Sequence, residues 1–207
     1  MKHKFWIDTH KGATGLAVLA FMAWFRDWSD ARAWLYLATH GSYGLFWITK
    51  SKFFPDRNWE RPASLGLGLS TWFGLSLYWV SPWLICSHRT EAPGAWWLGL
   101  CVALYAVGVF LHFTSDMQKH MAMTLRPGVL LTDGLWSLSR NPNYLGELFV
   151  YLGFSLLAYH WAPLAVLALF VVGVWFPNMN RTDRSLARYP EYAAWAAKTK
   201  KLIPFVY

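Results

Sequence analysis

The chain has 207 residues, of which 56% are hydrophobic and 14% are charged, whereas about 25% of the residues of an average soluble domain are charged. Nineteen Lys and Arg residues against 11 Asp and Glu residues give a net charge of +8. Intrinsic disorder is excluded, because disordered chains contain few aromatic residues and here these make up 19%. Two cysteines are too few for a disulfide-stapled domain. A membrane protein and a nucleic-acid binder remain.

Apolar stretches follow one another along the chain, the first of them short for a membrane crossing. A crossing helix needs about 20 mostly apolar residues. The first four stretches are residues 12–25, 33–49, 63–86 and 95–113. The fifth, residues 144–176, is too long for one crossing and predicts a helical hairpin with a turn at residues 159–163. We therefore predict one all-α domain over residues 1–207, a polytopic membrane helix bundle of about six transmembrane helices without a cleavable signal peptide.

Positive charge is distributed unevenly between the two faces that six crossings would create. Both termini would lie on one side, together with sixteen of the 19 Lys and Arg residues, and only Arg26, Arg32 and Arg89 would lie on the other. Cytoplasmic loops retain Lys and Arg, so both termini are predicted to be cytoplasmic, in a bacterial inner membrane or the endoplasmic reticulum. Because cations at helix ends explain the basic composition, the expected partner is the lipid bilayer and not nucleic acid.

Two longer polar segments, residues 114–143 and 177–207, lie on the cation-rich side. Pro142 is suited to the first turn of a helix, which would place Asn143 and Glu147 on one face, four residues apart. Polar side chains at membrane depth are costly unless they line a cavity, so this face is a candidate site. The structural alternative is that Glu147 pairs with Arg140 to close the start of the helix.

Several separated motifs carry a resemblance to a known family. They are Ser115-Asp116, Leu125-Arg126-Pro127-Gly128, Gly134-Leu135-Trp136, RNPNYLGE at residues 140–147, Tyr189-Pro190 and the closing LIPFVY. In this order they resemble the C-terminal half of the steroid 5-alpha-reductase family over residues 108–207. The same membrane superfamily holds sterol C14 reductases and isoprenylcysteine carboxyl methyltransferases, which share an Arg-x-Pro-x-Tyr-x-Gly element.

The resemblance implies an NADPH pocket in residues 108–207 that opens to the cytosol, beside a cavity for a hydrophobic small-molecule substrate. The family motifs place Asp116, Arg126, Asn143, Tyr144 and Glu147 in that pocket. The chemistry of the side chains is suitable, because arginines such as Arg126 and Arg140 bind phosphate in a bidentate manner and carboxylates accept from ribose hydroxyls. The remaining cofactor candidates are His112, one helical turn before Asp116, and Asn178 and Arg181 in the tail, Arg181 as a phosphate contact.

The N-terminal half departs from the family. In the reductases a Tyr and a Glu there bond to the substrate ketone, and no matching pair is present. His40, Tyr43 and Tyr78 are the candidates for substrate polarisation. The alternative for a His inside an apolar helix is a structural bond to a neighbouring hydroxyl or carbonyl group. No Cys, His and carboxylate spacing suggests a zinc site.

Three functions of different class are compatible with the sequence. The first is an NADPH-dependent membrane oxidoreductase that reduces an enone-type C=C bond of a steroid- or isoprenoid-like lipid. The second is an S-adenosylmethionine-dependent methyltransferase acting on a lipid or a prenylcysteine. The third is a non-catalytic lipid-binding protein of the same fold. Loss of the Tyr and Glu pair keeps the third open, and the shared motif keeps the second open.

Overall fold

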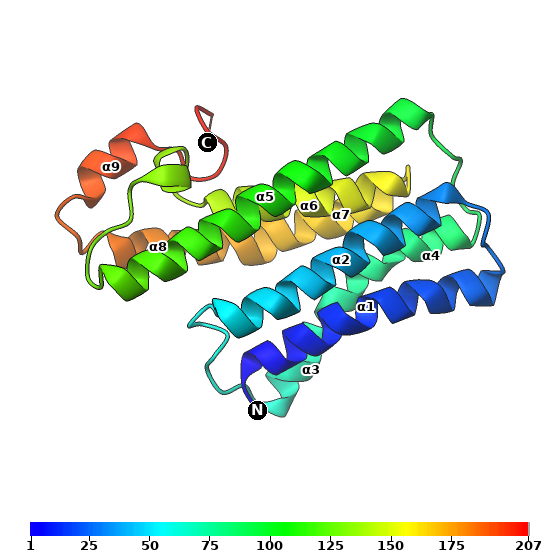
Figure 1. Ribbon diagram of the computed structural model, residues 1–207, viewed down its shortest axis with the longest axis horizontal. Helices are drawn as coiled ribbons and strands as arrows, with labels where there is room; N and C mark the ends of the chain where they lie inside the picture. Colours follow the sequence, from blue (N-terminus) through cyan, green and yellow to red (C-terminus); the bar gives the residue numbers. More distant parts are fainter. Residues whose placement is uncertain (207) are drawn as a thin grey trace. The chain divides into compact units, whose positions relative to one another are not determined.

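The computed structural model describes residues 1–206 and shows an all-α chain (Figure 1), as the sequence predicts. Within these residues there is no β-strand, and isolated bridges join only Lys2 to Pro62 and Ser139 to Lys200. The helices are α1 (His3–Phe25), α2 (Ala31–Phe53), α3 (Leu65–Ser76), η1 (Leu77–Trp79), α4 (Val80–Cys86), α5 (Ala95–Leu125), η2 (Gly134–Ser137), α6 (Pro142–Leu157), α7 (Trp161–Phe170), η3 (Val171–Trp175), α8 (Phe176–Leu186) and α9 (Tyr192–Lys198).

The first helix begins well before the apolar run that predicted it. The amides of His3 and Lys4 donate to the carbonyl oxygens of Arg61 and Trp59, at 2.9 and 2.8 Å. Amides in the first turn of a helix have no partner within the helix, so these loop carbonyls stabilise a start at His3. The next helix, α2, has a side-chain cap at its start, because the Asp30 carboxylate accepts from the amide of Arg32 at 2.8 Å.

The segment expected to be a polar loop after residue 113 is partly helical. Helix α5 continues to Leu125, because no Gly or Pro interrupts the chain between residues 109 and 126. The predicted start at Pro142 is confirmed. The predicted hairpin is also present, since α6 ends at Leu157 and α7 begins at Trp161, with Tyr159 in the left-handed region at φ 50° between them.

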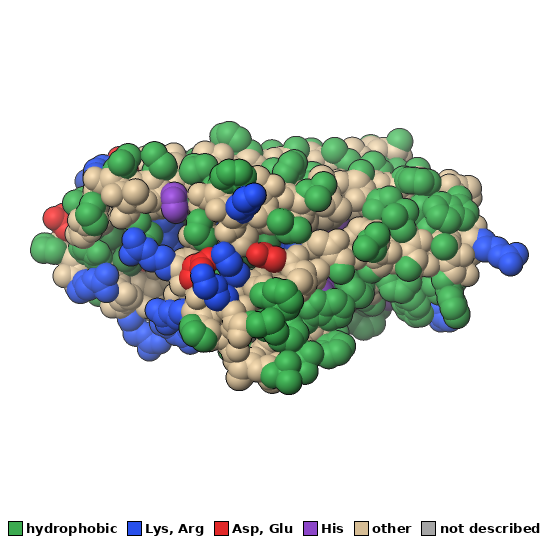
Figure 2. Space-filling view, turned by 60° about the horizontal axis from the view of Figure 1, so that its bottom comes forward, with side chains coloured by type: hydrophobic (Ala, Val, Ile, Leu, Met, Phe, Trp, Pro, Cys, Tyr) green, Lys and Arg blue, Asp and Glu red, His purple; other side chains and the backbone are tan. Residues whose placement is uncertain are grey.

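Two helical segments are long and apolar enough to cross a membrane. They are Ala95–Leu125 and the continuous segment Trp161–Leu186, which contains a π-helical turn at Val171–Trp175. Only 22% of the most apolar window of each is buried, whereas the core helix of a soluble protein is mostly buried. Hydrophobic side chains also cover much of the face drawn in Figure 2, where Lys and Arg gather around carboxylates in one region. The chain has the character of a membrane protein.

The chain divides into two compact units. Unit 1 comprises Met1–Tyr105 and Tyr151–Leu167. In it, α1 packs against α2, α3 and α4. The approach of α2 to α1 requires Gly44, because a Cβ there would overlap the carbonyl oxygen of Lys11. Ser81 on α4 donates to the carbonyl oxygen of Phe154 on α6 at 2.9 Å.

Unit 2 comprises Ala106–Val150 and Ala168–Tyr207. Its small apolar core is formed by Leu130, Trp136 and Trp195, with Leu186 and Tyr192 packed against it. The indole of Trp195 donates to the carbonyl oxygen of Trp136 at 3.0 Å, and the indole of Trp136 donates to that of Ser115 at 3.2 Å. This core therefore joins α9 to the segment that precedes α6 and to α5.

Candidate functional site

Two glycines bring the backbones of α5 and α6 into contact in unit 2. A Cβ on Gly108 would lie 2.6 Å from the amide nitrogen of Val150 and 2.7 Å from the carbonyl oxygen of Gly146. A Cβ on Gly146 would overlap the backbone of His112. The glycine of the RNPNYLGE motif is therefore needed for packing, and it fixes the position of the first turns of α6 against α5.

This contact brings His112, Asp116 and Asn143 together. The ring Nδ1–H of His112 donates to the carbonyl oxygen of Asn143 at 3.1 Å, because a carbonyl can only accept. The His112 Nε2 atom lies 3.8 Å from a carboxylate oxygen of Asp116, one helical turn further along α5. Both side chains are buried, with 2% and 7% of the residue exposed. The expected pairing of His112 with Asp116 on one helix face is present.

The side-chain amide of Asn143 offers a hydrogen-bond acceptor to a ligand. Its side-chain oxygen is buried and accepts no hydrogen bond from residues 1–206. A buried acceptor without a donor costs about 1–3 kcal/mol, and such a cost is typical of binding sites. Two further candidates follow on α6: the ring of Tyr144 lies 5.7 Å from that of Trp175, and Glu147 is half-buried one turn later.

Arg126 lies apart from that cluster, beside a cleft in unit 2. The cleft has a volume of about 250 Å³ and is lined by Gln118, Leu125, Arg126, Leu131, Asp133 and Gly134, with Met121 and Ala122. The guanidinium is half-exposed and lies 3.3 Å from the Asp133 carboxylate. A half-exposed arginine at the mouth of a cleft is suited to a phosphate group.

Arg140 holds the C-terminal segment. Its guanidinium donates to the carboxylate of Asp183 at 3.1 Å and to the carbonyl oxygens of Ala196 and Thr199 at 3.2 and 2.6 Å. Burial, and then the negative charge of Asp183, raise the pKa of the nearby Tyr192 hydroxyl. Arg140 therefore pairs with Asp183 on α8 and with carbonyl groups of the C-terminal segment. It does not close the start of α6 by pairing with Glu147, which was the structural alternative.

The two tail candidates lie on α8. Asn178 is half-buried and Arg181 is exposed, and neither makes a hydrogen bond or ion pair with another candidate within the described residues. The structure therefore brings His112, Asp116 and Asn143 together, whereas Arg126, Arg140, Asn178 and Arg181 have separate surroundings.

The three substrate candidates meet in an aromatic cluster of unit 1. The ring of His40 stacks on Phe154 with a centroid distance of 4.2 Å, and the ring of Tyr78 stacks on Tyr151 at the same distance. The ring centroid of Tyr43 lies 5.9 Å from that of Tyr151. All three candidates are buried, so helices α2 and α6 and the η1 turn bring them to one place.

Hydrogen bonds determine which nitrogen of His40 carries the proton. The Tyr36 hydroxyl donates to the carbonyl oxygen of Tyr78 at 3.0 Å, which uses its only proton. His40 Nδ1, 2.8 Å from that hydroxyl oxygen, must then be the donor. Neutral His40 therefore presents Nε2 as an acceptor and has no second N–H to give to a substrate ketone. His40 thus makes the structural hydrogen bond to a neighbouring hydroxyl group that the sequence analysis gave as the alternative.

Two residues of this cluster, Lys11 and Tyr151, are not among the candidates predicted from the sequence. The charge distribution had placed Lys11 among the cations of the membrane surface. Lys11 is 3% exposed, and its ammonium donates a hydrogen bond to the hydroxyl oxygen of Tyr151. The ammonium also lies 4.6 Å from the ring centroid of Tyr43 and 5.2 Å from that of Trp47. The only signal in the sequence is a lysine that directly precedes an apolar run.

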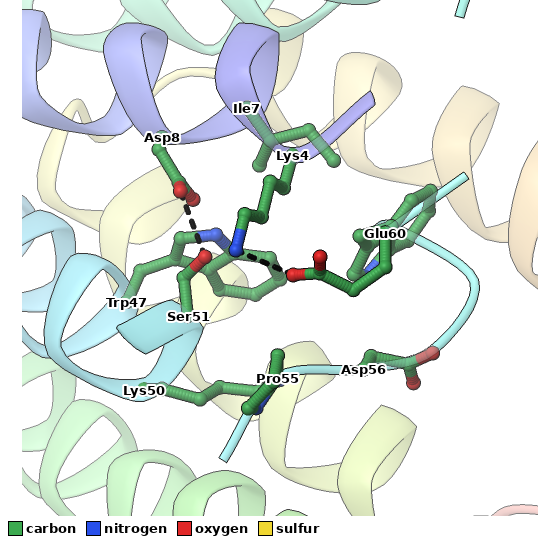
Figure 3. A pocket seen from close by; sticks show the side chains of 10 residues that line it. Lys4, Ile7, Asp8, Trp47, Lys50, Ser51, Pro55, Asp56 and Glu60 are labelled. Carbon is green, nitrogen blue, oxygen red and sulfur yellow. Dashed lines mark hydrogen bonds and ion pairs between the residues drawn. The ribbon is translucent and has the colours of Figure 1, made fainter. Parts of the chain in front are cut away.

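A small cavity lies where the ends of α1 and α2 meet the loop after α2 (Figure 3). In Figure 3, Asp8 accepts from Ser51 at 2.7 Å and Lys4 forms an ion pair with Glu60. Hydrogen bonds from Lys2 and Lys4 hold the pKa of Glu60 below its usual value. The cavity has a volume of about 10 Å³, room for about one water molecule, and the charged pairs fasten the loop to α1.

Comparison with known sequences assigns the chain to a family. The family model described as "Protein of unknown function (DUF1295)" matches residues 69–199. The chain belongs to this family. DUF1295 falls within the steroid 5-alpha-reductase-like superfamily, so the resemblance carried by the motifs is confirmed. The matched region contains all the cofactor candidates and one substrate candidate, Tyr78.

Two curated proteins are similar to this DUF1295 member. The cobalt-zinc-cadmium resistance protein CzcN of Cupriavidus metallidurans is 34% identical over 69% of this chain and 57% of its own length. The steroid 5-alpha-reductase DET2 of Arabidopsis thaliana is 28% identical over 54% of this chain and 43% of its own length. The alignments thus span about half of each relative.

Proposed function

We propose that this DUF1295 protein is a membrane-embedded, NADPH-dependent reductase of an enone-type C=C bond in a hydrophobic, steroid- or isoprenoid-like lipid. The observation that carries the proposal is the buried cluster of His112, Asp116 and Asn143, in which the amide oxygen of Asn143 has no donor among the described residues. The cluster lies within the family match, and one relative is named a steroid 5-alpha-reductase.

The side chains of unit 2 fit NADPH. The Asn143 oxygen is suited to accept from the carboxamide of the nicotinamide ring, and Asp116 and Glu147 to accept from ribose hydroxyls. Arg126, half-exposed at the 250 Å³ cleft, is suited to a phosphate. When bound, NADPH would supply a hydride to the substrate. The contribution of these residues is to bind and orient it, since orientation accounts for much of the rate of such reactions.

The proposal includes six membrane crossings with both termini in the cytoplasm. The supporting observation is that every predicted stretch is mostly helical, including the third, in which α3, η1 and α4 follow one another from Leu65 to Cys86. Segments of about 20 residues suffice to cross the hydrocarbon core. Fifteen of the sixteen cations would then lie on the cytoplasmic side, where an anionic dinucleotide is available, because Lys11 is buried in unit 1.

We assign carbonyl polarisation to unit 1, where Tyr43 and Tyr78 lie in one buried aromatic cluster with His40, whose only N–H is used by Tyr36. A polar group enclosed in an apolar bundle is costly and marks a functional site. Cofactor binding and carbonyl binding are thus assigned to separate sets of residues, and each has its own test.

The test of the proposed function is a titration of the detergent-purified protein with NADPH and, in parallel, with S-adenosylmethionine, followed by nucleotide fluorescence and thermal shift. We expect saturable binding of NADPH that is weakened at least tenfold by Asn143→Ala. The matched control is Asn180→Ala, an exposed asparagine on α8 that bonds to Lys201 at 2.7 Å, which should bind as the parent does. If the protein responds to S-adenosylmethionine alone, the reductase proposal is wrong and the methyltransferase function is favoured. If it responds to neither ligand, the non-catalytic lipid-binding function is favoured.

A further inference from the structure

Lys11 is a buried cation on α1, directly before the apolar run of residues 12–25. It is enclosed by Tyr43 and Trp47 of α2 and by Tyr151 of α6, with its ammonium 5.0 Å from the ring centroid of Tyr151. Burying an ammonium group in an apolar helix bundle removes its hydration, and contacts with aromatic faces restore only part of the lost interaction. A lysine buried in an apolar helix bundle is therefore a candidate for function.

The bond between Lys11 and Tyr151 has a fixed direction. An ammonium can only donate, so the Tyr151 oxygen accepts from Lys11, and the hydroxyl proton of Tyr151 is directed to an acceptor other than Lys11. The neighbouring ammonium also stabilises any negative charge that develops on the Tyr151 oxygen. Tyr151 is thus arranged as a hydrogen-bond donor that can give up its proton.

Neighbouring rings hold Tyr151 in this arrangement. Tyr78 stacks on it at 4.2 Å, and Phe154 meets it edge to face at 5.7 Å. Neutral His40, by contrast, presents an acceptor at Nε2, because its Nδ1–H is used by Tyr36. Among the residues of this cluster, the Lys11 and Tyr151 pair is therefore better suited than His40 to bind the oxygen of a carbonyl group.

We propose that Tyr151 is the hydrogen-bond and proton donor to the carbonyl oxygen of the substrate, with Lys11 as the positioning residue that stabilises the resulting tyrosinate. This inference rests on the proposed reductase function. The pair would take the place of the Tyr and Glu that the resembled reductases use and that this sequence lacks.

In the proposed reaction, Tyr151 supplies one proton and the hydride supplies the electron pair. As the hydride adds to the β-carbon, the electron pair of the C=C bond moves through the conjugated system onto the carbonyl oxygen, and Tyr151 transfers its proton to that oxygen to give an enol. The enol becomes the saturated ketone by moving that proton to the α-carbon. A proton from water returns through Lys11 to Tyr151.

Carbonyl binding is tested without the cofactor. The probes are cyclohex-2-enone and a 3-keto-Δ4 steroid, each labelled with 13C at the carbonyl carbon, and the readout is the isotope-edited infrared band of the bound ketone. We expect the parent protein to shift this band to lower wavenumber, Tyr151→Phe to abolish the shift, and Lys11→Met to reduce it. Lys11→Arg, which keeps the charge, should restore part of it.

Two control variants remove similar groups from unit 1. Tyr105→Phe deletes a hydroxyl that bonds to Ser42 at 2.7 Å, and Lys50→Met deletes a buried lysine whose ammonium lies 4.5 Å from the Trp47 ring centroid. Both should keep the band shift. With NADPH and the steroid, Tyr151→Phe should lower kcat by about 10²-fold, the usual contribution of a general acid, with little change in KM for NADPH.

The two proposals fail in different ways. If the parent protein shifts neither probe, or if Tyr151→Phe keeps the full shift, the assignment of Tyr151 is overturned even where NADPH binds. If the band shifts as expected and NADPH does not bind, the carbonyl site stands and the reductase function fails. Equal losses in Lys11→Met and Lys11→Arg would show that the charge of Lys11 has no part in it.

Discussion

Gly108 on α5 and Gly146 on α6 face each other so closely that a Cβ on Gly108 would lie 2.7 Å from the carbonyl oxygen of Gly146. The neighbouring atoms belong to the backbone and cannot rotate away. We therefore expect Gly108→Ala to push the two helices apart, to lower the free energy of unfolding by about 1–3 kcal/mol and to weaken NADPH binding. Thermal unfolding in detergent and the NADPH titration measure the two effects.

Gly99, on the same helix, provides the matched control. A Cβ there meets no atom within 4 Å, and alanine is favoured over glycine inside a helix by about 1 kcal/mol. Gly99→Ala should therefore leave stability unchanged or raise it, with normal NADPH binding. Equal behaviour of the two variants would show that the α5 and α6 backbones are not in contact at Gly108.

Local patterns were sufficient to predict much of the helix arrangement. Pro142 marked the start of α6, and the four-residue spacing of His112 and Asp116 predicted their shared helix face. These are relationships within one helix, which the period of the helix determines. The start of α1 at His3 was missed, because it depends on carbonyl groups of residues 59 and 61 that only the folded chain brings near.

In the candidate site, too, features within one segment could be predicted from the sequence and contacts between helices could not. The motif identified Asn143, but the packing role of Gly146 against Gly108 appears only when two helices meet. Lys11 and Tyr151 are 140 residues apart in the sequence, and no local pattern joins them. A lysine beside an apolar run reads as a surface cation, because snorkelling to the interface is the usual behaviour of such residues; here tertiary packing buries it instead.

Arg140 provides a prediction about the C-terminal segment. Replacing it by glutamine leaves the carbonyl oxygens of Ala196 and Thr199 and the Asp183 carboxylate without their donor, at about 1–3 kcal/mol for each buried group left unsatisfied. We expect Arg140→Gln to speed hydrogen exchange at residues 192–206 at least tenfold. Arg188→Gln, which removes only surface bonds to Ser185 and Tyr189, should leave it unchanged. Equal exchange in both variants would contradict the anchoring role.

Asp30 at the start of α2 should make stability depend on pH. Its burial acts to raise the pKa of the carboxyl, but hydrogen bonds and charge from Arg32 outweigh burial and hold the pKa below its usual value. A lowered pKa in the folded state stabilises the fold above the unfolded pKa of 3.8, and this contribution is lost as the pH falls through the lower folded value.

The variant that isolates this charge is Asp30→Asn, because asparagine still caps a helix. It should be less stable than the parent by roughly 1–2 kcal/mol at about pH 6, and the difference should shrink as the pH falls below about 4. Thermal unfolding across this range measures it. Glu91→Gln removes a carboxylate from the neighbouring loop without touching the Arg32 and Asp30 bonds, and serves as the control. A difference that stays constant down to the lowest pH would contradict the ion pair.

Arg126 and Asp133 together predict which nicotinamide cofactor is preferred. The Arg126 guanidinium lies at the 250 Å³ cleft, 3.3 Å from the Asp133 carboxylate, and a phosphate there would compete with that carboxylate for the same donors. If this phosphate is the one that distinguishes NADPH from NADH, Arg126→Ala should weaken NADPH binding about tenfold, or about 1.4 kcal/mol, and leave NADH binding unchanged. Asp133→Asn should strengthen NADPH binding, because it removes the competing negative charge.

Lys198→Ala, which removes a cation from α9, controls for general electrostatic attraction. Fluorescence titrations with both cofactors decide the matter: equal weakening of NADPH and NADH by Arg126→Ala would place the guanidinium on the pyrophosphate that the two cofactors share.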